Sequence, residues 1–180
     1  MSWKIDPIHS QITFAVRHMM ISNVHGRFEN FTGTVELDEA DPTRSTVDVQ
    51  IEAASINTEE AQRDGHLKSP DFLNTAEFPY ITFKSTRLEK LDAQHARVHG
   101  DLTIRGVTHE AVLDVEYAGM AKSPFGHTSA GFTASTVINR KDWDLAWNVA
   151  LETGGWLVGD AINVNIELEL IKQSETEVVA

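Results

Sequence analysis

The densest group of side chains that could do chemistry lies at residues 63–69, where Arg63, Asp64 and His66 fall within about one turn of a predicted helix. An aspartate and a histidine side by side could act as general acid and base on a bound substrate. The same residues also suit structural bonds, because Asp64 precedes Lys68 by four residues, the order that favours an ion pair on a helix. We favour a structural or ligand-headgroup role and expect no enzyme; an enzyme acting on an apolar substrate through the Asp64/His66 region is the alternative.

Metal and cofactor chemistry find little support in the sequence. The chain has eight histidines and no cysteine, and it lacks the HExxH motif. His95 and His99 would both point outward from one strand, about 13 Å apart, which is too far for one ion to bridge. No nucleophile elbow, phosphate loop or dinucleotide fingerprint is present. We therefore expect no metal site, no cofactor and no catalytic residue.

The elements that must position these side chains are strands, because apolar and polar residues alternate along most of the chain. One dry and one wet face per strand is typical of antiparallel sheets. A closed barrel is favoured over a sandwich, since closure removes exposed edges and no strand carries a proline. The eight alternating segments are residues 12–16, 31–37, 47–53, 81–83, 96–104, 111–117, 130–138 and 162–170.

Turns are predicted at Asn23–Gly26, Asp38–Pro42, Arg105–Gly106 and Ser123–Gly126. Two irregular segments interrupt the pattern. Residues 57–74 predict two short helical turns, the first starting near Asn57 and Glu60 and the second at Ser69, which together would form a flap over one end of the barrel. Residues 141–160, rich in Trp and Gly, predict a long loop or distorted hairpin. The domain then spans residues 1–172, and residues 173–180 form a polar tail.

The predicted inward face is apolar and unusually rich in small residues, while the large aromatic side chains come from other strands. An eight-stranded barrel is just wide enough to be filled by side chains or to hold one small ligand. Small residues facing one another leave space, which favours a tunnel for an apolar ligand. Ordinary taper packing remains an equally valid interpretation. The small inward residues are Gly33, Ala53, Ala96, Gly100, Ala111, Ala130, Ala134 and Thr136.

The formal net charge of −12, from 27 acidic and 15 basic residues, disfavours nucleic acid as a partner. No basic segment followed by an apolar one precedes the first strand, and no run of about 18 apolar residues occurs. We expect a cytoplasmic protein, or a periplasmic one if a signal peptide has been removed. A homodimer is a candidate assembly.

An ordered series of motifs resembles the YceI-like family over residues 3–170, with one departure: Trp143-Asp144 stands where the family usually has Phe-Gly. The motifs are WKIDPIHS (3–10), FAVRH (14–18), VHGRF (24–28), RDGHLKSPDF (63–72), FPYITFKST (78–86), GDLTIRGVT (100–108), NRKD (139–142) and VGD (158–160).

The resemblance implies a lipocalin-like, eight-stranded barrel that binds a long isoprenoid, such as a polyprenyl phosphate or a quinone of the ubiquinone type. It implies a carrier, storage or sequestration protein, with no established catalysis. Family lipid contacts are mainly apolar, so inward side chains are the expected contacts, and the central motif adds three polar candidates for the headgroup. The expected ligand-binding residues are Phe14, Val16, Phe31, Arg63, Asp64, His66, Phe72, Ile81, Phe83 and Phe132.

Overall fold

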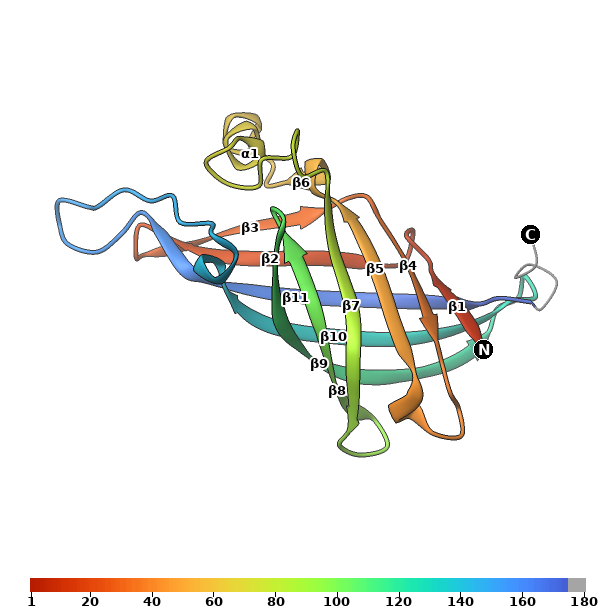
Figure 1. Ribbon diagram of the computed structural model, residues 1–180. Coiled ribbons are helices and arrows are strands. Elements are labelled where there is room, and N and C mark those ends of the chain that lie inside the picture. Colours follow the sequence, from red (N-terminus) through yellow and green to blue (C-terminus); the bar gives the residue numbers. More distant parts are fainter. Residues whose placement is uncertain (175–180) are drawn as a thin grey trace.

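Alternating side chains drive almost the whole chain into antiparallel strands, as the computed structural model shows for residues 1–174 (Figure 1). The structure contains one α-helix and three short 3₁₀ helices in this range. The strands and helices are β1 (Ser2–Ile5), β2 (Gln11–His18), β3 (Ser22–Phe28), β4 (Phe31–Glu36), a 3₁₀ helix (Pro42–Arg44), β5 (Thr46–Glu52), a 3₁₀ helix (Ala53–Ser55), β6 (Ile56–Asn57), α1 (Ala61–Lys68), β7 (Tyr80–Lys90), β8 (His95–Ile104), β9 (Val107–Lys122), β10 (Thr128–Asn139), a 3₁₀ helix (Arg140–Trp143) and β11 (Val158–Lys172).

These strands occupy eight positions around a closed barrel. β1 and β2 both pair with β11, at successive places along it, so together they form one interrupted strand. The next position is shared by β4, which pairs with β1, and β3, which pairs with β2. The third position is shared by β5, which pairs with β4, and β6, which pairs with β3. β7 pairs with β5, and β8 to β11 each pair with the strand that precedes them in the chain. The predicted eight-stranded antiparallel barrel is confirmed, with one predicted segment in each position.

Burial follows the alternation. On β10, for example, Ala130 is buried together with its partner Leu170 on β11, whereas Thr133 and Ser135 are exposed.

The barrel closes through the pairing of β1 with β11. This closure removes the free sheet edges at which another chain could pair.

Two turn predictions have different outcomes. The chain reverses at Arg105 and Gly106, with φ values of 50° and 71°, as a tight hairpin turn requires. The turn predicted at Asn23–Gly26 is wrong, because these residues lie within β3, and the reversal occurs at residues 19–21. Gly26 stands in the strand because the Phe14 ring covers it: a Cβ there would lie 2.9 Å from Phe14 Cε1.

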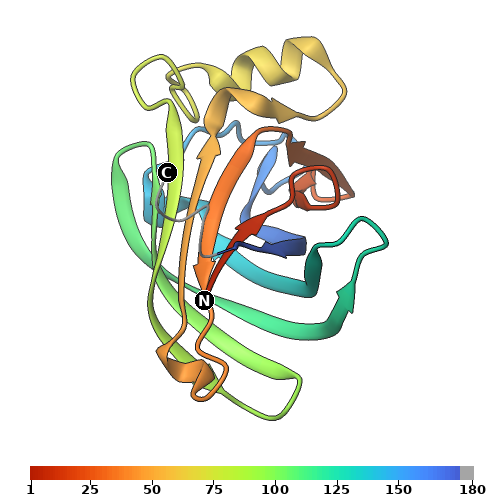
Figure 2. The same ribbon diagram turned by 90° about the vertical axis from the view of Figure 1, so that its right-hand side faces the viewer.

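The flap contains one helix rather than the two that were predicted. Glu60 caps the start of α1 by accepting hydrogen bonds from the backbone N–H groups of Gln62 and Arg63. Ser69 caps the end of α1 by donating its hydroxyl to the His66 carbonyl, and residues 70–77 then form turns. The Ser-Pro pair that looked like a second helix start therefore ends the first one. Figures 1 and 2 both show α1 at one end of the barrel, beyond the strand ends.

β11 ends at Lys172, and most of the predicted tail, residues 175–180, lies outside the described residues. Among the helices of residues 1–174, none has the length and apolarity needed to cross a membrane.

Candidate ligand-binding cavity

The barrel encloses a cavity of about 1260 Å³ whose wall is made by the inward, mostly apolar side chains of the strands. The cavity extends along the barrel axis. At one end it is lined by residues of α1 and of the segment 145–158, and at the other by the turns after β4 and β7. Small-molecule pockets usually have about 300–1,000 Å³, so this one has room for a long apolar molecule.

The small inward residues divide into two groups. Ala111, Ala130 and Ala134 line the cavity, as do Ala96 and Thr136, so their missing side-chain volume contributes to the empty space. The space above the two glycines is filled: Ile5 Cδ1 stands 2.6 Å from where a Cβ of Gly33 would lie, and Phe83 covers Gly100. Ala53 is buried in the core and lies outside the lining. Of the two interpretations left open by the sequence, the cavity supports the tunnel.

Most of the expected ligand-binding residues meet at this cavity. Two of them lie outside the lining. Phe31 is buried in the core, and Asp64 is turned to another partner. The expected residues that line the cavity are Phe14, Val16, Arg63, His66, Phe72, Ile81, Phe83 and Phe132.

Asp64 and Arg63 both form hydrogen bonds with Thr58, a buried residue three positions before the start of α1. Asp64 Oδ1 accepts hydrogen bonds from Thr58 N at 2.9 Å and Thr58 Oγ1 at 2.5 Å, rather than pairing with Lys68. Arg63 donates from Nε to Thr58 Oγ1 and from Nη2 to Thr58 O, both at 2.8 Å. The two side chains thus fasten the flap to the chain that leads into it, and Arg63 still reaches the cavity.

His66 faces the cavity mouth and has different partners. Its Nε2 lies 2.8 Å from Asp71 Oδ2. Its ring meets Phe72 edge-on, and it also contacts Trp147 of the long segment between β10 and β11. Because Asp64 bonds Thr58 and His66 bonds Asp71, the two do not form an acid–base pair.

Arg140 is a functional candidate that the sequence reasoning missed, and it lines the cavity with only 2% of its surface exposed. Its guanidinium donates to the carbonyls of Leu145, Trp147 and Gly159, so it ties the segment 145–158 to the barrel. Burial lowers the pKa of Arg140 from its ordinary value, and Asp160 opposes that shift. The NRKD motif was the available signal, but its pattern alone does not reveal burial.

The two ends of the cavity differ in charge. Arg63 and Arg140 line the flap end beside one acidic residue, Glu60. Three acidic residues line the opposite end beside one basic residue, Lys90, so that end carries net negative charge. The three are Asp38, Glu39 and Asp92. An anionic group on a bound molecule would therefore be attracted to the flap end and repelled from the other.

The part of the chain that the structure describes holds one group of side chains with metal-ligand spacing: Asp6, His9 and Glu169, with ligand atoms within 4.8 Å of one another. No metal site was expected from the sequence, in which Glu169 lies 160 positions after His9. All three lie outside the cavity lining.

Comparisons with known proteins agree with this architecture. The model of the YceI-like domain family matches residues 3–170. The UPF0312 protein SAS2572 of Staphylococcus aureus is 37% identical over 169 residues, covering 93% of this chain and 96% of its own. The crystal structure of the Campylobacter jejuni YCEI protein has a TM-score of 0.76 and 36% identity, covering 88% of this chain and 90% of its own. A polyisoprenoid binding domain from Saccharophagus degradans shares the fold at 15% identity, with a TM-score of 0.64 and coverage of 95% and 98%.

Proposed function

Because this chain belongs to the YceI-like domain family, we propose that it binds a long isoprenoid or similar apolar lipid inside the barrel, as a carrier, storage or sequestration protein. The observation that carries the proposal is the apolar cavity of about 1260 Å³ that extends along the barrel. A solved structure with the same fold is described as a polyisoprenoid binding domain, which supports this choice of ligand.

The driving force would be burial of apolar surface, which is worth about 25 cal/mol per Å² removed from water. The strands already form the cavity, so binding needs little reorganisation of the barrel. An elongated chain fits an elongated cavity with a continuous apolar wall, whereas a compact polar molecule would leave that wall without partners.

The lipid headgroup would lie at the flap end, where Arg63, His66 and Arg140 line the cavity. Arg63 uses Nε and Nη2 for Thr58, which leaves Nη1 to meet a phosphate or carbonyl oxygen. The acidic side chains at the opposite end favour the same orientation, since they would repel an anionic headgroup.

We propose that the protein acts by binding alone. An enzyme acting through the Asp64/His66 region is the rival function, but Asp64 is turned to Thr58, away from the cavity. Three further properties stay predictions. They are location in the cytoplasm (or in the periplasm if a signal peptide was removed), assembly as a homodimer, and the absence of nucleic-acid binding. Cell fractionation and light scattering would test the first two.

Delipidated protein should be titrated with a long polyprenol, with a prenol of farnesyl length and with a soluble sugar alcohol, and each mixture passed through gel filtration. We expect the long polyprenol to elute with the protein at one molecule per chain and the sugar alcohol to be absent. Failure of both prenols to elute with the protein would overturn the proposal. Conversion of a prenol to a new product would instead support the enzyme.

A further inference from the structure

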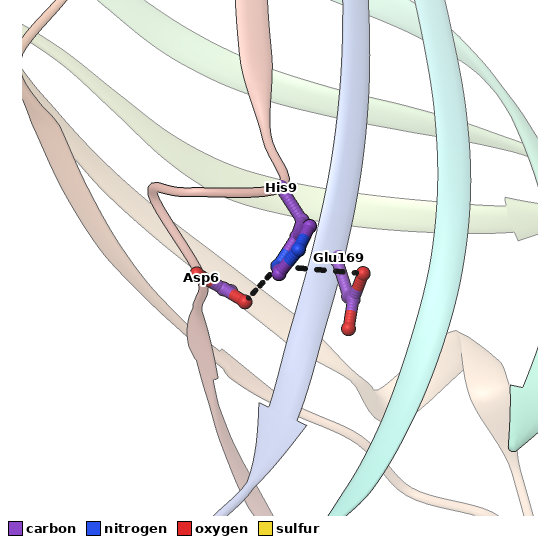
Figure 3. Close-up of side chains that lie close together, drawn as sticks. All are labelled: Asp6, His9 and Glu169. Carbon is purple, nitrogen blue, oxygen red and sulfur yellow. Dashed lines mark hydrogen bonds and ion pairs between the residues drawn. The ribbon is translucent and has the colours of Figure 1, made fainter. Parts of the chain in front are cut away.

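A short detour of the chain interrupts the strand formed by β1 and β2. Ile5 of β1 pairs with Leu170, and Gln11 of β2 pairs with Glu167, so residues 6–10 bulge outward beside β11. Figure 3 shows the result: Asp6 and His9 from the detour turn toward Glu169 on β11. All three lie outside the cavity lining, on the seam where the barrel closes.

The ligand atoms of these side chains converge on one point. His9 Nδ1 lies 2.7 Å from Asp6 Oδ2 and 4.0 Å from Glu169 Oε2. Ligand atoms bound to a tetrahedral ion at 2.0–2.2 Å stand about 3.3 Å apart, a value between these two distances. Small rotations of the exposed His9 and the half-buried Glu169 would therefore bring all three atoms into place, without backbone movement.

The backbone around the three side chains is fixed by hydrogen bonds to Glu169 itself. Asp6 N donates to Glu169 O at 2.9 Å, and Glu169 N donates to Ser10 Oγ at 3.0 Å, so the detour is bonded to β11 on both sides. Ile8 N donates to Asp6 Oδ1, which orients the buried carboxylate and leaves Oδ2 facing His9. Metal sites depend on this kind of outer hydrogen bonding.

The charge of the group favours a cation. Within residues 1–174, the recorded ion pairs of Asp6 and Glu169 are with His9 alone, so no lysine or arginine competes for the carboxylates there. Two carboxylates that face one imidazole carry a net negative charge, which a bound cation would neutralise.

We propose that Asp6 Oδ2, His9 Nδ1 and Glu169 Oε2 bind one divalent first-row transition ion of the zinc class, with water completing the coordination. One imidazole nitrogen and two carboxylates suit such an ion, whereas calcium and magnesium prefer oxygen ligands alone. Binding needs His9 Nδ1 without a proton, so the neutral imidazole carries its one proton on Nε2, a second proton of a charged ring leaves to solvent, and the metal–nitrogen bond replaces the hydrogen bond to Asp6. The ion would cross-link the detour to β11 and stabilise the barrel seam, independently of any lipid.

The test uses the full chain, freed of metal with a chelator, and titrates it with ZnCl₂ and separately with MgCl₂ by isothermal calorimetry, while Tm is followed by circular dichroism. The variants are H9Q and E169Q, which keep side-chain size. The control is H95Q, which removes a surface histidine that also lies between two carboxylates, Asp92 and Glu116. CoCl₂ provides a visible spectrum that reports nitrogen and oxygen ligands.

We expect one zinc site per chain, a higher Tm with zinc and at least about tenfold weaker binding in both H9Q and E169Q. H95Q should bind as the wild type does, and magnesium should give no saturable heat at the same concentrations. The proposal is overturned if the wild type shows no saturable zinc binding, if H9Q and E169Q bind as tightly as the wild type, or if only H95Q loses the site.

Discussion

The imidazole of His66 meets the indole of Trp147 edge-on, with ring centroids 4.6 Å apart and ring planes at 88°. His66 belongs to α1 and Trp147 to the segment between β10 and β11, so this contact joins the two elements that line the flap end of the cavity. Phe72 packs against both rings. The three rings, called the latch below, therefore pack together at the flap end of the cavity, and we expect a ligand to enter and leave where they separate.

Trp147→Ala should speed ligand release. An edge-on aromatic pair is worth about 0.5–1.5 kcal/mol beyond its buried area, which corresponds to release about 2 to 10 times faster. Stopped-flow transfer of a fluorescent polyene from protein to vesicles measures this rate. Trp156→Ala is the matched control, because Trp156 lies in the same segment but is 56% exposed and outside the lining. Equal rates in both variants would contradict the latch.

Gly100→Ala should destabilise the barrel by about 1–3 kcal/mol, the usual range for overpacking. The added Cβ would lie 2.6 Å from Phe83 Cε2 and 2.7 Å from the Lys84 carbonyl oxygen, so the ring and a backbone would both have to move. Gly131→Ala on β10 is the control, since its nearest neighbour, Ala118 Cβ, is at 3.5 Å. Urea unfolding should give Gly131→Ala a free energy of unfolding close to that of the wild type, and Gly100→Ala a clearly lower one. The reverse order would refute this explanation.

Asp144 departs from the glycine that the family resemblance implied for this position, and its backbone has a conformation that glycine favours. Its φ of 59° and ψ of 21° are left-handed, and Asp144 N closes the 3₁₀ helix onto Lys141 O. Aspartate tolerates this conformation better than alanine does, and glycine adopts it freely. Asp144→Ala should therefore lose about 1 kcal/mol of unfolding free energy, while Asp144→Gly keeps or raises stability. An Ala variant as stable as the Gly variant would be inconsistent with this reason.

The pKa of His95 is raised above its ordinary value, chiefly by its hydrogen bond to Asp92. A raised folded-state pKa contributes stability at pH values below the unfolded pKa of 6.5, and this contribution disappears as pH rises through the folded pKa. Asp92→Asn should bring the pKa of His95 down toward its ordinary value, because the amide carries no charge. An NMR titration of the imidazole measures it, and an unchanged pKa would rule out Asp92 as the cause.

The strands were predictable because each has one buried and one exposed face, a pattern that needs only local sequence. β3 was missed because Asn23 and Gly26 are typical of turns, and only the position of the Phe14 ring explains the glycine. Ser69-Pro70 was misread in the same way, since a serine can cap either end of a helix.

The site was less predictable than the fold. The inward aromatic residues followed from the alternation, and eight of the ten expected residues line the cavity. Asp64 and Arg140 have roles that depend on partners fixed by tertiary structure: Thr58 for Asp64, and the carbonyls of Leu145 and Trp147 for Arg140. His9 comes close to Glu169 only when the barrel closes, so their spacing in the sequence does not predict the contact.

The most direct test of the central claim, that the cavity holds the ligand, is native mass spectrometry of the protein purified without added lipid, with Ala134→Phe and Ser135→Phe compared. Ala134 lines the cavity, and its neighbour Ser135 is exposed on the outer face. We expect a bound lipid, extractable as an isoprenoid, on the wild type and on Ser135→Phe, and a clearly lower occupancy on folded Ala134→Phe. Protein that is repeatedly empty when purified from its natural host, or equal occupancy in the two variants, would contradict the account.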